Sequence, residues 1–278
     1  MSDNTKDIGA MPLTKATQKH FIGTDPEVFL VNNDGKMISS IDLIGGSKEF
    51  PRPIDDEGSA VQEDNVAVEY NIAPCQDVES FIARNRKVLQ YLSGLVASQG
   101  LSLSIKPSAV FDKDQLSDPR AKVFGCEPDF NAWKGGSINP RPNAKNKSLR
   151  SAGGHIHVGF NGENLDPNLV IKAMDLFIGV GMMKYDDDKD RRQLYGKAGA
   201  CRYKSYGVEY RTPSNAWLQS DETIRYVWQQ QERALEFVRS GEAEKLLTDD
   251  GDLGARIQEC INESNMDLYK ELAEEFQL

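Results

Sequence analysis

The stretch FIGTDPEVFLV, residues 21–31, decides the fold, because it combines strand-forming residues with two acids in its middle. β-Branched and aromatic residues of this kind favour a strand. Side chains two residues apart in a strand point to the same face, so Asp25 and Glu27 present their carboxylates together. Burying two like charges costs several kcal/mol per ion unless a cation compensates, which favours a bound metal ion. The alternative is a solvent-facing pair on a half-exposed sheet.

Two other apolar segments carry a single acid each. Glu69 lies in VAVEYN, residues 66–71, and Glu209 lies in GVEYR, residues 207–211. Each acid alone is explained by an outward-facing position on a sheet. The recurrence of the pattern favours a shared site.

Two of the three histidines lie in GGHIHVG, residues 153–159. On a strand His155 and His157 share one face, while Ile156 and Val158 point to the other. Imidazoles bind metals and phosphates at neutral pH, although an exposed or hydrogen-bonded pair is the alternative. The spacing therefore makes both histidines candidate site residues.

Basic residues gather in YGKAGACRYKSYGVEYR, residues 195–211. Arg211 shares a strand face with Glu209, and a guanidinium can bind two phosphate oxygens at once. Arg202 and Lys197 add positive charge just upstream. A plain surface ion pair between Glu209 and Arg211 is the alternative, worth at most about 1 kcal/mol. The sequence has no phosphate-binding P-loop and no glycine-rich dinucleotide fingerprint, so metals and arginines must build any nucleotide site.

Strand and helix patterns predict an α+β domain with a mainly antiparallel sheet. We expect strands over residues 21–31, 66–72, 101–105, 155–160 and 206–211, and helices over 77–100, 166–183 and 221–239. Residues 1–20 are expected to form a flexible tail. Residues 21–278 are expected to form a single domain, whose C-terminal part from about residue 221 is helical and acidic.

Composition narrows the class of protein. The chain has 278 residues, with 33 basic and 43 acidic side chains and a net charge of −10, which disfavours nucleic-acid binding. No apolar run reaches the roughly 18 residues of a membrane helix, so no membrane partner is expected. The four cysteines form no CxxC pair and favour reduced thiols in a cytoplasm.

Residues 134–150 carry five basic and no acidic side chains. This cationic segment could form a lid that binds phosphate, and the alternative is a solubilising loop.

Five segments, taken in this order, resemble the glutamine synthetase and glutamate–cysteine ligase superfamily, and most closely its phage-encoded carboxylate–amine ligases, the type 2 amidoligases. They are GTDPEVFLV (23–31), EDNVAVEYNIAP (63–74), FGCEPDFNAW (124–133), GGHIHVGF (153–160) and YGKAGACRYKSYGVEYRTPSNAW (195–217). The resemblance implies a glutamine-synthetase-like catalytic domain with a curved, mainly antiparallel sheet flanked by helices. It also implies the cytoplasm of an infected host cell as the location.

The resemblance implies a role for each candidate residue. The predicted metal ligands, for two divalent ions, are Asp25, Glu27, Glu69, His155 and Glu209. Asp25 stands where the synthetases usually have a glutamate, so its reach is shorter. His157 matches a contact to nucleotide phosphate or substrate, and Arg211 matches the arginine that stabilises the transition state. Arg202 and Lys197 are expected near the phosphates.

The implied function is an ATP-dependent carboxylate–amine ligase that forms an amide through an acyl phosphate and releases ADP. ATP and two Mg²⁺ or Mn²⁺ ions are the expected cofactors, since oxygen-rich ligands favour hard cations. The carboxylate and amine substrates stay unidentified, with a peptide or protein as one option. The alternatives are a non-catalytic structural or virion-associated relative and a divalent-metal-dependent hydrolase.

Overall fold

The computed structural model describes residues 20–122, 129–140, 145–160, 162–186, 188–248 and 251–278. The expected tail over residues 1–20 therefore falls almost wholly outside the described residues. Arg141 of the cationic segment also falls outside them.

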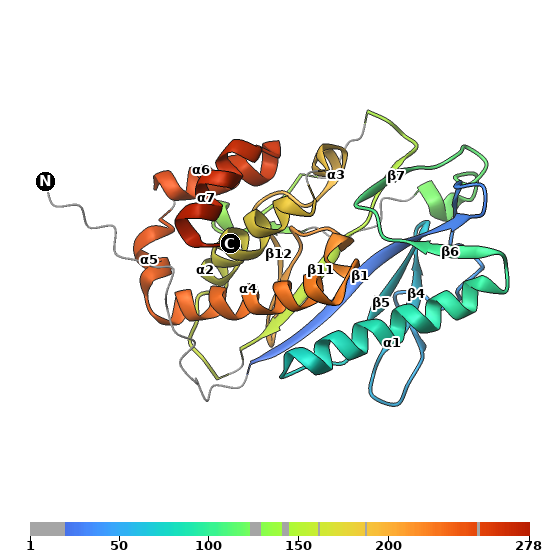
Figure 1. The fold of residues 1–278 in the computed structure, drawn as a ribbon, viewed down its shortest axis with the longest axis horizontal. Coiled ribbons are helices and arrows are strands. Elements are labelled where there is room, and N and C mark those ends of the chain that lie inside the picture. The colour runs from blue at the N-terminus through green and yellow to red at the C-terminus, as the bar shows by residue number, and fades with distance from the viewer. Residues whose placement is uncertain (1–19, 123–128, 141–144, 161, 187, 249–250) are drawn as a thin grey trace, which may run out of the picture.

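A large antiparallel sheet dominates the described chain (Figure 1). Its strand order is β3-β4-β5-β1-β11-β13-β12-β8-β9, with β2 and β6 also paired to β1. The strands are β1 (Phe21–Asn32), β2 (Met37–Ile38), β3 (Arg52–Pro53), β4 (Ala60–Asp64), β5 (Ala67–Asn71), β6 (Leu101–Ser104), β8 (Phe130–Asn131), β9 (Ser137–Ile138), β11 (Gly154–Gly159), β12 (Ala200–Lys204) and β13 (Gly207–Tyr210). β7 (Ser108–Val110) and β10 (Leu149–Ser151) form a separate antiparallel pair. The α+β prediction with a mainly antiparallel sheet is confirmed.

The predicted strands agree with β1, β5, β6, β11 and β13 to within one or two residues. β1 is central because its 12 residues pair with four strands: β11 pairs with its first half, β5 with its middle, and β6 and β2 with its end. The two acids of β1 therefore lie where strands from distant parts of the sequence meet.

Two long helices pack against each other along one face of the sheet (Figure 1). They are α1 (Val78–Ala97) and α4 (Asp221–Arg239), both as predicted. The Asp77 side chain caps α1 by accepting a hydrogen bond from the Ser80 amide, and Ser220 forms a capping box with Thr223 at the start of α4. Their apolar stripes cover the sheet face that carries Ile156 and Val158, which are fully buried.

The helix predicted over residues 166–183 is not one regular α-helix. It is α2 (Pro167–Met174), followed by a π-helical turn (Asp175–Val180) and a 3-10 turn (Gly181–Lys184). The Asp166 cap and Pro167 start it as expected. The change of winding begins at Asp175, a fully buried acid that accepts hydrogen bonds from other elements. π-Turns of this kind often mark functional regions.

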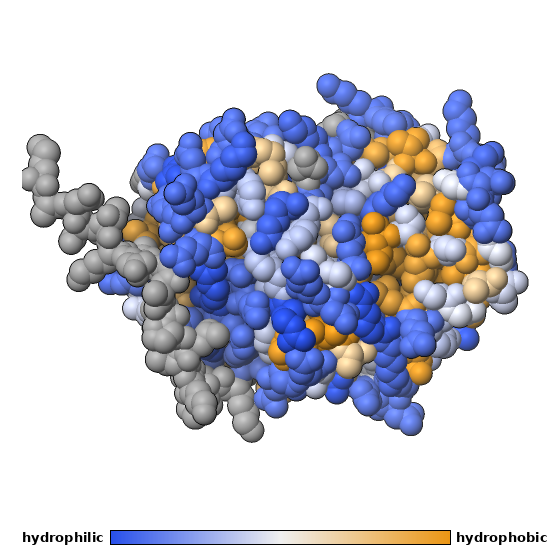
Figure 2. All heavy atoms as spheres, in the orientation of Figure 1, coloured by the Kyte–Doolittle hydropathy of each residue, from blue (hydrophilic) through white to orange (hydrophobic). Residues whose placement is uncertain are grey.

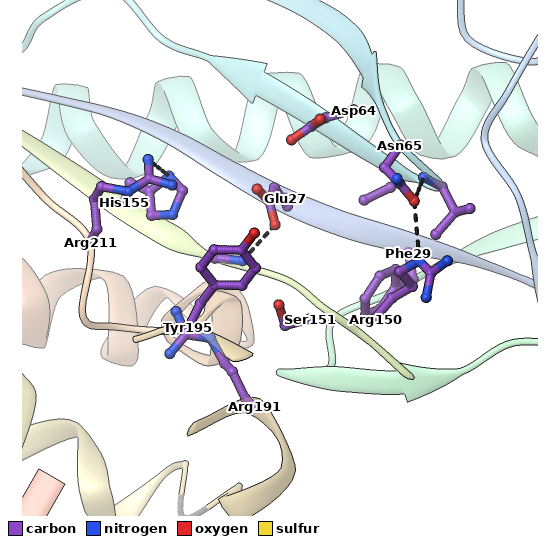
Figure 3. A pocket seen from close by; sticks show the side chains of 13 residues that line it. Glu27, Phe29, Asp64, Asn65, Arg150, Ser151, His155, Arg191, Tyr195 and Arg211 are labelled. Atoms are coloured by element: carbon purple, nitrogen blue, oxygen red, sulfur yellow. Dashed lines mark hydrogen bonds between the residues drawn. The ribbon is translucent and has the colours of Figure 1, made fainter. Parts of the chain in front are cut away.

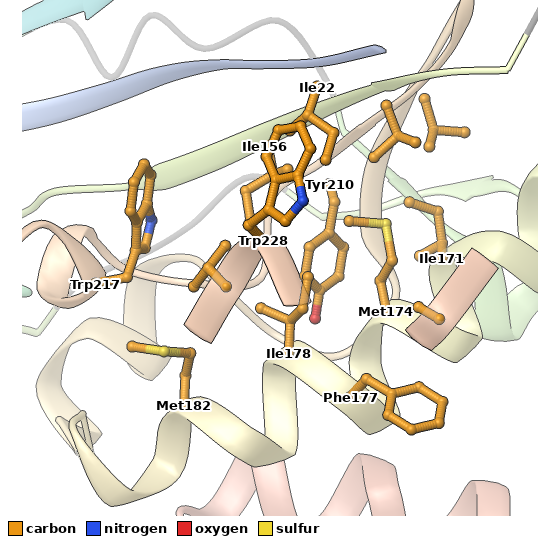
Figure 4. Close-up of a cluster of buried hydrophobic side chains, with 14 of the residues drawn as sticks. Ile22, Ile156, Ile171, Met174, Phe177, Ile178, Met182, Tyr210, Trp217 and Trp228 are labelled. Carbon is orange, nitrogen blue, oxygen red and sulfur yellow. The ribbon is translucent and has the colours of Figure 1, made fainter. Parts of the chain in front are cut away.

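The rest of the helical layer is α3 (Lys189–Leu194), α5 (Glu242–Leu246), α6 (Asp252–Glu263) and α7 (Met266–Phe276). α6 and α7 contact the π-helical turn, and the core between these helices and the sheet contains Trp217, Trp228, Met174 and Phe177 (Figure 4). Hydrophilic residues cover most of the face seen in Figure 2 on the side of α6 and α7. None of the described helices is long and apolar enough to cross a bilayer.

Candidate functional site

The polar candidates form a row across five adjacent strands of the sheet. β-Sheet register pairs Glu69 with Glu27, Asp25 with His155, and His157 with Glu209. It continues the row outward, with Gln62 opposite Glu69 and Arg202 opposite Glu209. Because Ile156 and Val158 fill the core on the opposite face, the HIH spacing places both imidazoles on the polar face, as predicted.

One cluster on this row consists of Asp25, His155 and Glu209. One ligand atom from each lies within 4.8 Å of the others. Asp25 Oδ1 lies 3.3 Å from His155 Nδ1 and 3.0 Å from His157 Nε2. Burial and the charge of Arg211 lower the pKa of His155 to about 4, so its imidazole is neutral and able to bind a metal. Burial opposes ionisation of Asp25, but His157 and His155 together hold its pKa well below the usual value.

A second cluster consists of Glu27, Asp64 and Glu69, whose ligand atoms also lie within 4.8 Å of one another. Burial, helped by the charge of Asp64, raises the pKa of Glu27 to about 7. Burial and the surrounding acids raise the pKa of Glu69 well above its usual value. Glu27 Oε2 accepts a hydrogen bond from the Gly153 amide at 2.8 Å, which fixes its direction. Burial and the mutual repulsion of these acids outweigh the nearby positive charge of Arg211, which lowers the pKa values of both Glu27 and Glu69.

Asp64 was not among the predicted site residues. It ends β4, one residue before the turn at Asn65, whose φ of 55° is left-handed. In the sequence it stands beside Glu63 in an acidic turn, a setting typical of solvated surface residues. Only the pairing of β4 with β5 brings it next to Glu69.

Three cations surround Glu209. Arg202 Nη1 lies 3.1 Å from Glu209 Oε1, Lys204 Nζ lies 2.8 Å from Oε2, and Arg211 Nη1 also donates to Oε1. Burial and Asp25 would raise the pKa of Glu209, but Arg211, His155 and Arg202 lower it to about 2. Arg211 Nη1 additionally lies 3.3 Å from His155 Nδ1. The predicted Glu209–Arg211 pair thus exists, but it is buried and belongs to a larger network.

A cavity of about 150 Å³, which we name the acid cavity, collects these groups. Among the described residues its lining is Asp25, Glu27, Lys48, Gln62, Asp64, Glu69, His155, Arg202, Lys204, Glu209 and Arg211. Every predicted metal ligand and both predicted arginines line it. Lys197 is not part of this described lining: its side chain is exposed, and its carbonyl accepts hydrogen bonds from Thr212 Oγ1 and the Ala200 amide.

Two further cavities adjoin the acid cavity. The apolar cavity, about 570 Å³, shares Asp25 and Glu69 with it and is otherwise lined by Phe21, Gly23, Thr24, Asn71, Ile72, Pro74, His157, Gly159 and Tyr206. His157 accordingly stands at the passage between the two, where its Nδ1 is 2.5 Å from the Tyr206 hydroxyl.

The arginine cavity, about 60 Å³, shares Glu27, Asp64, His155 and Arg211 with the acid cavity. Figure 3 shows Glu27 and His155 facing it from the sheet and Tyr195 and Arg191 facing it from the α3 side. Its outer wall includes Arg150, Asn65 and Ser151. The three cavities therefore form one path along the polar face of the sheet.

Two buried residues behind the strands were missed by the sequence reasoning. The Asp175 carboxylate accepts hydrogen bonds from Tyr210 Oη, Thr212 Oγ1, Trp133 Nε1 and the Gly199 amide. Arg191 donates to the carbonyls of Ala152, Thr212 and Pro213. Asp175 thus holds the side chains of the two residues next to Arg211, and Arg191 holds the backbone that follows Arg211. An acid inside the apolar run AMDLF was the one available signal for Asp175.

The described part of the cationic segment, residues 134–150, does not form one exposed loop. Lys134 and Lys145 are exposed, but Arg150 is buried in β10 and donates to the carbonyls of Ala121, Lys147 and Leu149. The lid hypothesis is therefore wrong for Arg150, because its guanidinium holds backbone together and cannot swing over a ligand.

Residues 143–240 match the sequence profile of a family described as phage phiEco32-like COOH.NH2 ligase-type 2. The match contains His155, His157, Arg202, Glu209 and Arg211, and it confirms the family predicted from the sequence. The family description supports a ligase that joins a carboxylate to an amine. No curated protein matches the chain.

Proposed function

We propose that this chain, with its carboxylate–amine ligase segment, is an ATP-dependent, ADP-forming ligase that works with two divalent ions. The observation that carries the proposal is the pair of metal-ligand clusters that share one cavity with Arg211. A ligase of this kind must hold a triphosphate beside a carboxylate substrate, and both are anions. A cavity lined mainly by carboxylates can bind them only with added positive charge.

The donor set fits two hard cations. Five carboxylates and one neutral imidazole suit Mg²⁺ or Mn²⁺. Asp25 Oδ1 lies within 3.3 Å of His155 Nδ1 and His157 Nε2, and Glu209 Oε2 lies 2.8 Å from Lys204 Nζ, so a metal ion bound here would replace these contacts. We assign Asp25, His155 and Glu209 to one ion, and Glu27, Asp64 and Glu69 to the other. When bound, the ions would neutralise phosphate charge and polarise the transferred phosphoryl group.

The three cavities suggest where each part of the substrates binds. The apolar cavity suits the base and ribose of the nucleotide, with His157 and Tyr206 next to the first phosphates. The acid cavity would hold the triphosphate. The arginine cavity would take the carboxylate substrate, because Arg150, Arg191 and Arg211 make it the most cationic of the three. Lys197 has no part in this proposal.

The proposed chemistry has two steps. A carboxylate oxygen attacks the γ-phosphorus, the bond from that phosphorus to the bridging oxygen breaks, and ADP leaves. The amine nitrogen then attacks the acyl carbon, loses a proton, and displaces phosphate. Arg211 would stabilise the charge on the transferred group through two guanidinium donors, and Arg202 would support it from the neighbouring strand.

The proposal treats residues 21–278 as one catalytic domain, since the cavities are lined from residue 21 to residue 211 and the C-terminal helices pack behind them. The proposal includes a glutamine-synthetase-like arrangement of the sheet and helices, as the resemblance implies. A cytoplasmic location also belongs to it, in keeping with free thiols at Cys75, Cys201 and Cys260.

The nucleotide product tests the proposal. Purified protein with Mg²⁺ and ATP, supplied with panels of carboxylates and amines, should yield ADP and orthophosphate. Arg211→Lys should lower turnover by at least tenfold more than it lowers nucleotide affinity, since a point charge cannot replace a bidentate contact made in the transition state. AMP and pyrophosphate would overturn the acyl-phosphate route but leave a ligase. Metal-dependent hydrolysis without nucleotide would favour the hydrolase, and inactivity across the panels would favour a structural relative.

A further inference from the structure

Positively charged side chains line the acid cavity from two opposite directions along the strand order of the sheet. Arg202 and Lys204 belong to β12, and Arg211 follows β13, so all three approach from one side. Lys48 lies in the loop between β2 and β3, at the other end of the strand order. The strands β4, β5, β1 and β13, which carry the carboxylates, lie between these flanks.

The loop that carries Lys48 is anchored at its base. Gly46 has a φ of +82° and no room for a Cβ, because such an atom would lie 2.6 Å from the Val61 carbonyl oxygen. Glu63 Oε1 accepts hydrogen bonds from the Ile44 and Gly45 amides. A two-way backbone pair between Ser47 and Phe50 closes the tip. The loop thus has a defined geometry that holds residue 48 at the cavity.

The two flanks differ in what they contact. The β12 and β13 cations all lie within ion-pair distance of Glu209 and so belong to the cluster of Asp25, His155 and Glu209. The loop adjoins β4, which supplies Gln62 and Asp64 to the cavity beside Glu69 and Glu27. Lys48 is therefore the cavity-lining cation on the side of the Glu27, Asp64 and Glu69 cluster.

We propose that Lys48 binds the terminal phosphate of the nucleotide from the side opposite to Arg202 and Lys204. This inference rests on the proposed function and adds a residue to it. A lysine ammonium is a compact charge with three donors on a flexible stem, which suits a phosphate oxygen on an exposed rim. Lys48 is exposed and lines the acid cavity, so its ammonium can approach a ligand held there.

The test compares Lys48→Met and Lys48→Arg with a control, Lys36→Met, which removes a lysine whose exposed ammonium pairs with Asp112 on the surface. Calorimetry measures Mn²⁺ binding alone, and then binding of β,γ-methylene-ATP and of AMP in the presence of Mn²⁺. We expect Lys48→Met to weaken binding of the triphosphate analogue about tenfold or more, with AMP affinity changed less than threefold. Lys48→Arg should restore most of the loss.

Mn²⁺ affinity should not fall with the affinity for the triphosphate analogue, and this difference is a second measurement. Removing a positive charge next to five carboxylates should leave Mn²⁺ affinity unchanged or raise it, whereas a distorted cavity would lower it. Equal loss of AMP and triphosphate binding, or reduced Mn²⁺ affinity, would overturn the assignment of Lys48. Unchanged binding of all three probes would overturn it as well. If the unmodified protein binds no triphosphate with Mn²⁺, the proposed function itself fails, and this inference fails with it.

Discussion

Replacing Glu27 by glutamine should make the metal-free protein more stable relative to the unmodified one as pH rises from 5 to 8. Burial raises the pKa of Glu27 from 4.5 to about 7, so the folded state holds a proton that the unfolded chain has already lost within that window. The free energy of unfolding therefore falls as pH rises from about 4.5 to about 7. A shift of this size corresponds to about 3 kcal/mol at pH 8.

Other buried groups also titrate, so the difference between the two proteins is the quantity to measure. Burial lowers the pKa of His155 to about 4, which gives a contribution of opposite sign between pH 4 and 6.5. Asp175, whose pKa burial raises to about 6, adds a contribution of the same sign as Glu27. Both are present in the Glu27→Gln protein, and the amide oxygen of the introduced glutamine can still accept the hydrogen bond from Gly153. Subtraction thus isolates the Glu27 carboxylate together with its electrostatic effect on Glu69.

Urea unfolding at pH 5, 6, 7 and 8 with a chelator gives the required curves, and Glu274→Gln, a change at an exposed helical acid, is the matched control. The Glu27→Gln protein should gain about 2–3 kcal/mol on the unmodified protein between pH 5 and 8, while the control stays parallel to it. Saturating Mn²⁺ at pH 8 should stabilise the unmodified protein far more than Glu27→Gln. Parallel curves for all three proteins would refute the view that folding desolvates this acid.

Two further predictions follow from the same network. Glu209→Gln removes one charge from the Asp25, His155 and Glu209 cluster, so Mn²⁺ affinity measured by calorimetry should fall about tenfold or more in a folded protein; unchanged affinity would make Glu209 only a partner of Arg211. Asp175→Ala leaves the Trp133, Gly199 and Tyr210 donors without their acceptor, while Thr212 Oγ1 keeps the Lys197 carbonyl, and it should cost about 3–5 kcal/mol of unfolding free energy. Asp175→Asn should cost less than half of that, because its amide can donate to the Tyr210 and Thr212 hydroxyls; equal losses in the two variants would contradict this hydrogen-bond account.

Strand periodicity could predict the sheet-borne part of the site. Asp25 and Glu27, His155 and His157, and Glu209 lie on strands that also carry apolar residues for the opposite face, so a two-residue spacing fixed which side chains share a face. It could not predict that these strands are adjacent in the order β5-β1-β11-β13. The family resemblance implied a common set of metal ligands, and the structure supplies the strand order that turns separate acids into two clusters.

The missed residues have no periodicity that marks them. Asp64 ends β4 next to a turn and Lys48 lies in a loop, where charged residues are usual and where only tertiary pairing decides what they face. Lys197 shows the reverse error: it follows the glycine at residue 196 in a basic stretch, but the turn before β12 points its side chain to solvent. The cluster of basic residues in the sequence therefore indicated a site near these strands. The geometry of the loops decided which of the cations reach that site.

The charges of the acid cavity explain why metal and nucleotide binding should depend on each other. Its described lining has five carboxylates against four cations, so with His155 neutral the formal charge is one negative when every acid is ionised. Two divalent ions would make the same cavity strongly positive, and a triphosphate would bring it close to neutrality again. Each kind of ligand therefore supplies the charge that the other needs, and by linkage each should raise the affinity for the other by the same factor. Burial and the nearby acids raise the pKa values of Glu27 and Glu69, so protons and metal ions would compete for these carboxylates. Metal binding near neutral pH should consequently release protons. The measurements of stability, metal affinity and nucleotide affinity therefore all depend on the same carboxylates.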